Sequence, residues 1–410
     1  MRITVVGFLV VASSCMSASG CFEDDCTKTL TCPSDDSVGG SGAGTSSTGG
    51  AGASTNSVGG SGGGGGGAGG HEPSYGATAV AAGDGHTCAI VAGGRVVCWG
   101  ANDDGQLGNG TFMPSSTPVE VSNLDSVVQL ALGSRHSCAV RADGSVWCWG
   151  DATFRQIGEA TDAGVPISVP DVTNAAGVAA GAQHTCAYLN GGTAKCWGQG
   201  SSGQLGHGYN PHSSQPVAVD TLSSVSDLVG GADHSCAIDE QQAVYCWGSS
   251  GDVSSGNTPG LVFFVGSPGP PLSGSDLATT DTFACAVRVG KPWCWGTGYQ
   301  ADAVEVELTN VVRLDGSARH MCATIQNGNL HCWGENDGGQ LGTGSAGGTI
   351  EAPTAVANLS GPVSSVAPGG RHTCALVQGA VWCWGGNDEG QLGNGSQQPS
   401  LAPSPVKYLP

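Results

Sequence analysis

This chain is short of charge, and of positive charge above all. Only 11% of its 410 residues are charged, and Asp and Glu outnumber Lys and Arg by 33 to 13, which gives a formal net charge of −20. Nucleic-acid phosphates are bound by clustered Lys and Arg, and anionic lipid head groups attract polybasic segments. We therefore expect neither nucleic acid nor an anionic lipid surface to be a partner.

Motifs of the common enzyme classes are also missing. The chain has no His-Glu-x-x-His motif, and its Gly-x-Ser-x-Gly string at residues 59–63 lies in a Gly-rich tract and not between a strand and a helix. Its Gly-x-Gly patterns have no strand before them and no helix after them, so they are not nucleotide-binding fingerprints. No sustained helical period is present either. The sequence therefore predicts a protein that is not an enzyme, with no catalytic residue, metal site or cofactor.

What the chain does contain is one hairpin phrase in seven copies, each with two cysteines and a final Cys-Trp-Gly. The clearest copy, HSCAVRADGSVWCWG, spans residues 136–150, and successive first cysteines are 50, 48, 50, 49, 37 and 52 residues apart. A period near 50 indicates supersecondary units that bury their apolar faces against one another. Each unit holds short strand-like runs between Gly, Asn, Asp and Pro. We therefore predict an all-β, seven-bladed β-propeller.

The cysteine spacing predicts a disulfide across each hairpin. Five copies have cysteines ten positions apart, which fits a three-residue loop such as 142–144. Two copies have them nine apart, which fits the two-residue loops 289–290 and 378–379. Because loop length and spacing change together, the sulfurs stay opposite each other. The expected pairs are Cys88–Cys98, Cys138–Cys148, Cys186–Cys196, Cys236–Cys246, Cys285–Cys294, Cys322–Cys332 and Cys374–Cys383.

The same register places Ala139 opposite Trp147 and Ser137 opposite Trp149. An alanine follows the first cysteine and a tryptophan follows the second in all seven copies. A large ring over a small partner fills one sheet face without overpacking, so we predict that these tryptophans pack between blades.

The two ends of the array predict how the ring closes. Residues 77–83 align with 127–133, and residues 404–409 align with 117–123, the segment that precedes them in a repeat. We therefore expect the C-terminal strand to complete the blade that the N-terminal strand begins.

Two motifs together resemble a known repeat family. Residues 133–137 read Gly-x-x-His-Ser, Trp149-Gly150 ends the hairpin, and residues 102–108 read Asn-x-x-Gly-Gln-Leu-Gly. This combination is similar to the repeats of the regulator of chromosome condensation family, over residues 75–410. The resemblance implies a seven-bladed propeller, and the paired cysteines are similar to those of the exported bacterial branch. The family's best-known activity, guanine nucleotide exchange on a nuclear GTPase, depends on loop residues that we cannot assign in this chain.

The N-terminal region predicts export. Residues 1–20 carry Arg2, an apolar run and small residues before Cys21, which is typical of a secretory signal peptide. The sequence Ala-Ser-Gly-Cys at 18–21 resembles a bacterial lipobox and predicts lipid attachment at Cys21. Cleavage by an ordinary signal peptidase is the alternative.

Two further segments precede the propeller. Residues 21–33 hold the anchor and Cys26 and Cys32, which are expected to close a small loop. Residues 34–74 are rich in Gly and Ser and predict a flexible, disordered tether. Such cysteine usage is typical of an oxidising compartment.

A histidine just before the first cysteine recurs in six units, and Asn and Asp recur in the Gly-rich loops. One imidazole in each blade would lie too far from the others to bind one metal ion, so we expect these histidines to be hydrogen-bonded within their blades. The loop Asn and Asp residues fit turn chemistry better than a calcium loop. The histidines are His86, His136, His184, His234, His320 and His372.

The fourth and fifth units depart from the repeat. Only 27 residues separate Cys294 from Cys322, and the fourth unit adds the apolar residues Leu261, Val262, Phe263 and Phe264 before a Pro-rich segment. Irregular loops on a rigid scaffold often carry recognition. These four residues are therefore a candidate partner site, with repeat decay as the alternative.

Together these patterns predict an exported, lipid-anchored, monomeric propeller that binds an unidentified protein. We expect it at the outer membrane or cell surface, or in the periplasm or medium, with membrane contact only through the lipid. One alternative function is guanine nucleotide exchange. The other is a carbohydrate-active propeller enzyme, which would require convergent carboxylates.

Overall fold

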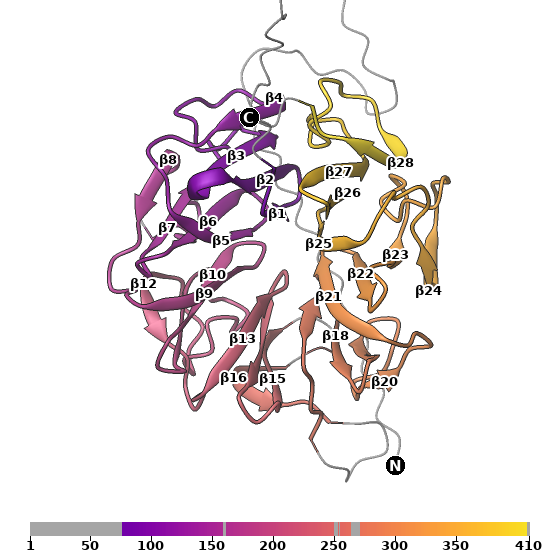
Figure 1. Cartoon of the computed structure of the whole chain (residues 1–410). Helices are drawn as coiled ribbons and strands as arrows, with labels where there is room; N and C mark the ends of the chain where they lie inside the picture. The colour runs from indigo at the N-terminus through magenta and orange to yellow at the C-terminus, as the bar shows by residue number, and fades with distance from the viewer. Residues whose placement is uncertain (1–75, 159–160, 250–252, 254, 264–270, 408–410) are drawn as a thin grey trace, which may run out of the picture. The chain divides into compact units, whose positions relative to one another are not determined.

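The structure is a computed structural model that describes residues 76–158, 161–249, 253, 255–263 and 271–407 (Figure 1). The expected signal peptide, Cys21, the Cys26–Cys32 loop and the tether lie outside these ranges. Within them, no helix is long and apolar enough to cross a membrane.

The described residues form 28 strands in seven four-stranded antiparallel sheets, each built from consecutive strands (Figure 1). The predicted all-β, seven-bladed propeller is confirmed. In each blade the first strand lines the centre and the fourth lies outermost. Because strands alternate in direction, the connections from first to second and third to fourth strand share one face, which we call the loop face. The second-to-third hairpins lie on the opposite, hairpin face.

The strands of blades 1 to 4 are as follows. Blade 1 has β1 (Ala79–Ala82), β2 (His86–Val91), β3 (Arg95–Gly100) and β4 (Ser115–Glu120), with a 3-10 turn η1 (Ala92–Gly94). Blade 2 has β5 (Val127–Leu132), β6 (His136–Arg141), β7 (Val146–Gly150) and β8 (Ala163–Ser168). Blade 3 has β9 (Ala175–Ala180), β10 (His184–Leu189), β11 (Ala194–Gly198) and β12 (Ser213–Ala218). Blade 4 has β13 (Val225–Gly230), β14 (His234–Asp239), β15 (Val244–Ser249) and β16 (Ser255–Leu261).

The remaining three blades follow the same plan. Blade 5 has β17 (Leu277–Thr279), β18 (Phe283–Arg288), β19 (Lys291–Gly296) and β20 (Val304–Glu305). Blade 6 has β21 (Val311–Ser317), β22 (His320–Ile325), β23 (Leu330–Glu335) and β24 (Thr349–Ala355). Blade 7 has β25 (Val363–Pro368), β26 (His372–Val377), β27 (Ala380–Gly385) and β28 (Ser400–Pro405).

The central hairpin of each blade has the register that the cysteine spacing predicts. Cys138 of β6 lies directly opposite Cys148 of β7. Gly144 ends the three-residue loop at a φ of 78°, a conformation that glycine adopts without steric cost. In the shorter blade 5 hairpin, Val289 and Gly290 both have positive φ, 51° and 70°, as a type I′ turn requires. Loop length therefore compensates for cysteine spacing.

All fourteen hairpin cysteines are paired as disulfides and buried. The bonds join Cys88–Cys98, Cys138–Cys148, Cys186–Cys196, Cys236–Cys246, Cys285–Cys294, Cys322–Cys332 and Cys374–Cys383. Each bond crosslinks the second and third strands of one blade. A chain with seven such bonds is typical of an oxidising environment.

The tryptophans that follow the second cysteines form the cores between blades. All seven are at most 1% exposed. Trp99 of blade 1, for example, packs in one cluster with Cys374 and Leu376 of blade 7. Ala139 lies opposite Trp147, as expected. The prediction of inter-blade tryptophans is confirmed.

The N- and C-terminal strands do not share a blade, so the predicted closure is wrong. β1 pairs only with β2, and β28 only with β27. The segment 117–123, which the C-terminus resembles, contains the end of β4, whereas 127–133 contains β5 of the next blade. The described strands therefore begin and end at blade boundaries. Blade 1 packs on blade 7, where the N–H of Ala77 donates to the carbonyl of Gly379 at 2.9 Å.

Candidate functional site

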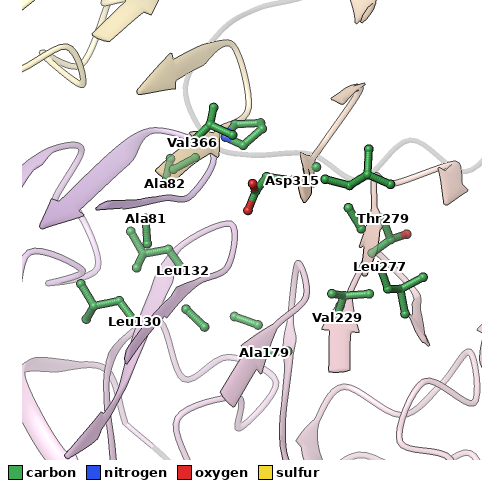
Figure 2. A pocket seen from close by; sticks show the side chains of 18 of the residues that line it. Ala81, Ala82, Leu130, Leu132, Ala179, Val229, Leu277, Thr279, Asp315 and Val366 are labelled. Atoms are coloured by element: carbon green, nitrogen blue, oxygen red, sulfur yellow. The ribbon is translucent and has the colours of Figure 1, made fainter. Parts of the chain in front are cut away.

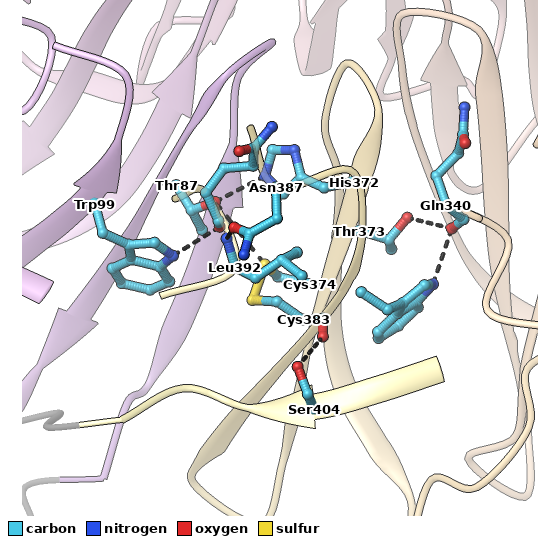
Figure 3. The surroundings of a disulfide bond; sticks show 12 residues. Thr87, Trp99, Gln340, His372, Thr373, Cys374, Cys383, Asn387, Leu392 and Ser404 are labelled. Atoms are coloured by element: carbon cyan, nitrogen blue, oxygen red, sulfur yellow. Dashed lines mark hydrogen bonds between the residues drawn. A yellow bond between two sulfur atoms is a disulfide. The ribbon is translucent and has the colours of Figure 1, made fainter. Parts of the chain in front are cut away.

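A repeated polar cluster, which we call the seam clamp, joins each regular blade to the next (Figure 3). At the seam between blades 7 and 1, His372 Nε2 lies 2.8 Å from Thr87 Oγ1. That hydroxyl donates to the backbone carbonyl of Gln391 at 3.1 Å, and Trp99 Nε1 donates to the same carbonyl at 2.8 Å. The histidine and glutamine of one blade thus hold the threonine and tryptophan of its neighbour.

The Gly-Gln-Leu-Gly loop is shaped to present this carbonyl. Asn387 Oδ1 accepts the N–H of Leu392 at 2.9 Å, and its Nδ2 donates to the carbonyl of Ser396 at 2.9 Å. Gly393 has a φ of 64°, and a Cβ there would lie 2.7 Å from Trp99 Nε1. The Asn of the motif therefore organises a turn. Among the described residues, no group of three His, Cys, Asp or Glu side chains is placed to hold a metal ion.

Five seams carry the histidine, hydroxyl and carbonyl of the clamp. In four of them the tryptophan also donates to that carbonyl, whereas Trp197 Nε1, between blades 2 and 3, has no hydrogen-bond partner among the described residues. The histidine-to-hydroxyl distances are 2.7–2.9 Å, and the hydroxyl-to-carbonyl distances are 2.7–3.1 Å. The members, in the order histidine, hydroxyl and carbonyl, are His86, Ser137 and Gln106; His136, Thr185 and Gln156; His184, Ser235 and Gln204; His320, Thr373 and Gln340; and His372, Thr87 and Gln391.

The histidines therefore bond to the next blade, and the expectation of bonds within a blade is wrong. The hydroxyl has one hydrogen, which it gives to the carbonyl, so the histidine must donate from Nε2. Burial lowers the pKa of His372 to about 3 and that of His136 to about 4. These imidazoles stay neutral at physiological pH and serve as structural donors.

Blade 5 lacks the clamp on both sides. Toward blade 6, Phe283 and Met321 replace the histidine and the hydroxyl, and both are buried. Trp333 Nε1 there donates to the hydroxyl of Tyr299 at 3.0 Å instead of to a loop carbonyl. Toward blade 4, His234 Nε2 still bonds to Thr279 Oγ1 of blade 5, but that hydroxyl donates to the backbone carbonyl of Thr280 and not to a loop carbonyl of blade 4. Trp295 Nε1 there has no hydrogen-bond partner among the described residues. The repeat irregularity thus corresponds to two altered seams.

Of the described residues proposed as a partner site, only Val262 is buried. Leu261 ends β16 and is 40% exposed. Val262 is buried, and its N–H donates to the carbonyl of Val244 at 3.0 Å. Phe263 forms an isolated bridge with Pro271, and Phe264 lies outside the described residues. The outermost strand of blade 4 carries this segment into the core, so Val262 is not available to a partner.

An axial cavity of about 250 Å³ is lined by the innermost strands of all seven blades (Figure 2). Small and apolar side chains such as Ala81, Leu132 and Ala179 line the part over blades 1 to 3. The charged lining residues all come from blades 4, 5 and 6, and they are Asp227, Asp276, Arg313 and Asp315. The cavity is therefore charged on one side only.

Burial makes the axial carboxyl groups weak acids. It raises the pKa of Asp276 to about 7, although the N–H of Leu314 donates to this carboxylate. Burial also raises the pKa of Asp315 to about 7, against the opposing attraction of Arg313, whose Nε lies 3.1 Å away. The pKa of Asp227 rises to about 6 for the same reason. The cavity can therefore hold and exchange protons near neutral pH.

These axial carboxyls were not predicted from the sequence. Asp227 and Asp276 occupy the position along the central channel that Ala79 holds in blade 1 and Gly177 holds in blade 3. Gln129 holds this position in blade 2 and Arg313 holds it in blade 6. A strand-by-strand alignment of the seven repeats would therefore have shown a variable position that is charged in blades 4, 5 and 6.

Comparison with known proteins agrees with the fold. The family described as "Regulator of chromosome condensation (RCC1) repeat" matches residues 93–140, 143–188, 193–238, 327–376 and 378–410. A second family of the same description matches residues 77–106, 127–156, 176–204, 225–252 and 363–391. The matches of the first cover more than half of the chain.

Similar proteins of known sequence match shorter stretches. The mitochondrial RCC1 domain-containing protein RUG3 of Arabidopsis thaliana is 38% identical over 100 residues, which are 23% of this chain and 22% of that protein. The probable E3 ubiquitin-protein ligase HERC3 of Homo sapiens is 40% identical over 92 residues, 22% of this chain and 9% of that protein. Each match spans less than a quarter of the relative's length.

Solved structures show the same fold. Yeast RCC1 (Prp20), from its complex with Kap60, has a TM-score of 0.66 at 19% identity, covering 82% of this chain and 86% of that one. Human WBSCR16 has a TM-score of 0.50 at 20% identity, covering 81% and 82%. The seam clamps, the seven blades and the family matches lead to one conclusion: this chain belongs to the regulator of chromosome condensation (RCC1) repeat family.

Proposed function

We propose that this chain is an exported, lipid-anchored, monomeric propeller that binds another protein at the cell envelope without catalysis. The observation that carries the proposal is a set of exposed apolar side chains on loops of a rigid scaffold. Phe112, Met113 and Tyr209 are 50%, 71% and 70% exposed at connections of the loop face. Loops held by a rigid scaffold are where recognition is usually built.

Export is supported by the N-terminal sequence and by the disulfides. Residues 1–20 have the pattern of a signal peptide, and Cys21 follows a lipobox-like sequence. Seven buried disulfides fit an oxidising compartment and would be rare in a cytosolic protein. A tether of the composition of residues 34–74 would let the propeller move away from the membrane that holds its anchor.

The anchor is tested by palmitate labelling in a bacterial host, with fractionation of the envelope. We expect label in the wild-type chain and none in Cys21→Ser, with both forms exported and oxidised. Equal labelling would exclude lipid attachment at Cys21. A cytoplasmic chain with free thiols would overturn the proposed location, whatever the propeller binds.

Guanine nucleotide exchange is the alternative that family membership suggests. It would require contact with a GTPase in a reducing compartment, where disulfides are rare. Nucleotide release from purified GTPases on addition of the propeller, together with a cytoplasmic location, would favour exchange over envelope binding.

The axial cavity favours a second alternative, carbohydrate chemistry. Glycoside hydrolysis uses paired carboxyl groups, one of them with a raised pKa, and Asp276 and Asp315 both have a raised pKa. However, Asp276 accepts a backbone N–H and Asp315 is paired with Arg313, which favours structural roles. Turnover of a glycoside panel by the wild type that is lost in Asp227→Asn would support the enzyme.

A further inference from the structure

Four exposed apolar side chains of the loop face lie over blades 1 to 3, and a fifth, Leu401 of β28 in blade 7, is 41% exposed. Phe112 and Met113 lie in the loop between β3 and β4, Val165 lies on β8 and is 40% exposed, and Tyr209 lies in the corresponding loop of blade 3. In blade 6 the equivalent residues 343–348 read Thr-Gly-Ser-Ala-Gly-Gly. Phe, Met and Tyr are enriched at protein interfaces. The loop face is therefore asymmetric, with most of its exposed apolar side chains over blades 1 to 3.

The loop that carries Phe112 and Met113 is held in place from both sides. Asn102 Nδ2 donates to the carbonyl of Met113 at 2.9 Å. The N–H of Gly110 donates to the carbonyl of Gly164 in blade 2 at 2.8 Å. A Cβ on Gly164 would lie 3.3 Å from the ring of Phe112, so this ring rests on the backbone of the next blade. Because these contacts already hold the loop in one conformation, a partner would bind a preformed surface.

The same seam is acidic. Burial raises the pKa of Asp104 against the attraction of Arg135, whose Nε lies 2.6 Å from it, and the neighbouring carboxylates add to the rise. These groups are therefore close enough to interact. The charged side chains that act on Asp104 are those of Arg135, Asp151, Asp162 and Asp103. Asp103 and Asp162 are exposed beside the apolar residues.

We infer that the surface formed by Asp103, Phe112, Met113, Asp162 and Val165, the seam 1–2 surface, docks a folded protein that offers Lys or Arg around an apolar hollow. Phe112 and Met113 fill the hollow, and the carboxylates meet the basic rim. Charge complementarity selects this partner, since an acidic surface would repel acidic partners and anionic lipids. The inference rests on the proposed protein-binding function and names the surface and partner chemistry for it.

Site-specific photocrosslinking in cells that export the full chain tests the surface. A photoreactive phenylalanine analogue is placed at position 113, or at position 289 on the hairpin face. Val289 is 90% exposed and serves as the matched apolar control. We expect a discrete crosslinked protein from position 113 and none from position 289.

The crosslinked protein is then purified and titrated against the full propeller. We expect Met113→Lys to weaken binding at least tenfold. Because the Met113 side chain is exposed, this change should leave the fold intact. Phe112→Ser should have a similar effect, and Val289→Ser should change affinity less than twofold. Asp103→Asn with Asp162→Asn should weaken binding a few-fold and flatten its dependence on salt. The amide oxygen introduced at position 162 would still accept the N–H of Ala152, which Asp162 accepts in the wild type.

The outcomes separate the surface from the proposed function. A crosslink from position 289 alone would overturn the surface while leaving protein binding intact. No crosslink from either position would count against both. A partner found through position 113 that is acidic, or whose binding is insensitive to salt, would overturn the proposed partner chemistry.

Discussion

Trp99 of blade 1 donates its indole N–H to the backbone carbonyl of Gln391 in blade 7, which is 2.8 Å away in space and 292 residues away in the chain. The Cys-Trp-Gly hairpin and the Gly-Gln-Leu-Gly loop recur in the sequence as separate motifs. In the structure they are two halves of one seam, because a backbone carbonyl in the loop of one blade accepts a hydrogen bond from the hairpin of the next blade. Thr87 adds a second donor to the same carbonyl.

Removing one hydroxyl should therefore destabilise the closing seam. Thr87→Val keeps the shape of the side chain but leaves His372 Nε2 without an acceptor in a buried site. An unsatisfied buried polar group costs about 1–3 kcal/mol. We expect a loss of that size in the free energy of unfolding from urea titration. The matched control is Thr349→Val, at an exposed threonine of β24, where a change under about 0.5 kcal/mol is expected.

The buried histidines predict a loss of stability in acid. The pKa of His372 is about 3 in the folded chain, against 6.5 for an unperturbed imidazole. Below pH 6.5 the unfolded chain takes up protons that the folded chain refuses, so this stability contribution falls as the pH falls. The loss is about 1.4 kcal/mol per pH unit for each such group. Urea titrations from pH 6.5 to 4.5 should show His372→Gln with a shallower slope than the wild type.

Thr87→Val provides the control for that experiment, because it removes the partner hydroxyl and leaves the imidazole. It should lower stability at every pH while keeping nearly the wild-type slope. Equal slopes of stability against pH for all three proteins would mean that His372 takes up its proton at the same pH in the folded and unfolded chains.

The axial carboxyls predict the opposite dependence on pH. The pKa of Asp276 is about 7 when folded and 3.8 for the unperturbed group. Between these values the folded chain holds a proton that the unfolded chain has lost, so the wild type loses stability as the pH rises to 7. Asp276→Asn keeps an acceptor for the N–H of Leu314 and cannot ionise. Its stability relative to the wild type should rise by about 1.4 kcal/mol per unit from pH 5 to 7 and then level off.

The repeat made the scaffold predictable from sequence. The change of cysteine spacing from ten to nine at Cys285 and Cys374 set the hairpin register and the disulfides. Ring closure was mispredicted because the alignment of the ends does not show where one blade stops. β4 and β5 are adjacent in the repeat, but they belong to different blades.

The candidate sites were harder to predict. The acids of the axial cavity converge from three different blades, and only the closed ring brings them together. The exposure of Phe112 depends on the loop hydrogen bonds of Asn102 and on the backbone of the next blade. Leu261 and its neighbours were predicted as a partner site because the repeat is irregular there, yet Val262 is buried in the core of the fold. An apolar run looks the same in sequence whether it faces a core or solvent.

Each disulfide should stabilise its blade by a modest amount. In the chain-entropy model a loop of about ten residues is worth about 2–3 kcal/mol. We expect the double variant Cys374→Ala and Cys383→Ala to lose about that much in urea titration while retaining the propeller fold. When the folded wild type is treated with a reductant in the absence of urea, the buried hairpin disulfides should stay intact. Mass spectrometry after alkylation should then show no modified hairpin cysteines. Rapid alkylation of the native chain would contradict the burial of these bonds.

The seam between blades 5 and 6 should open before the others. It has no seam clamp, its Phe283 and Met321 make only apolar contacts in place of the polar bonds, and the neighbouring strand β20 has only two residues. Local opening is easiest where few buried bonds must break. Hydrogen exchange followed by mass spectrometry should therefore show faster exchange in peptides from blade 5 than in those from blade 1.

One variant tests whether the faster hydrogen exchange originates at the seam between blades 5 and 6. Tyr299→Phe removes the acceptor of Trp333 Nε1 and should speed exchange further at the border of blades 5 and 6. Peptides around Trp99, at the closing seam, should exchange as in the wild type. Slow exchange in blade 5, equal to that of blade 1, would mean that apolar packing of Phe283 and Met321 holds the seam as firmly as the clamp does. Uniform acceleration in all blades would instead indicate global destabilisation by the variant.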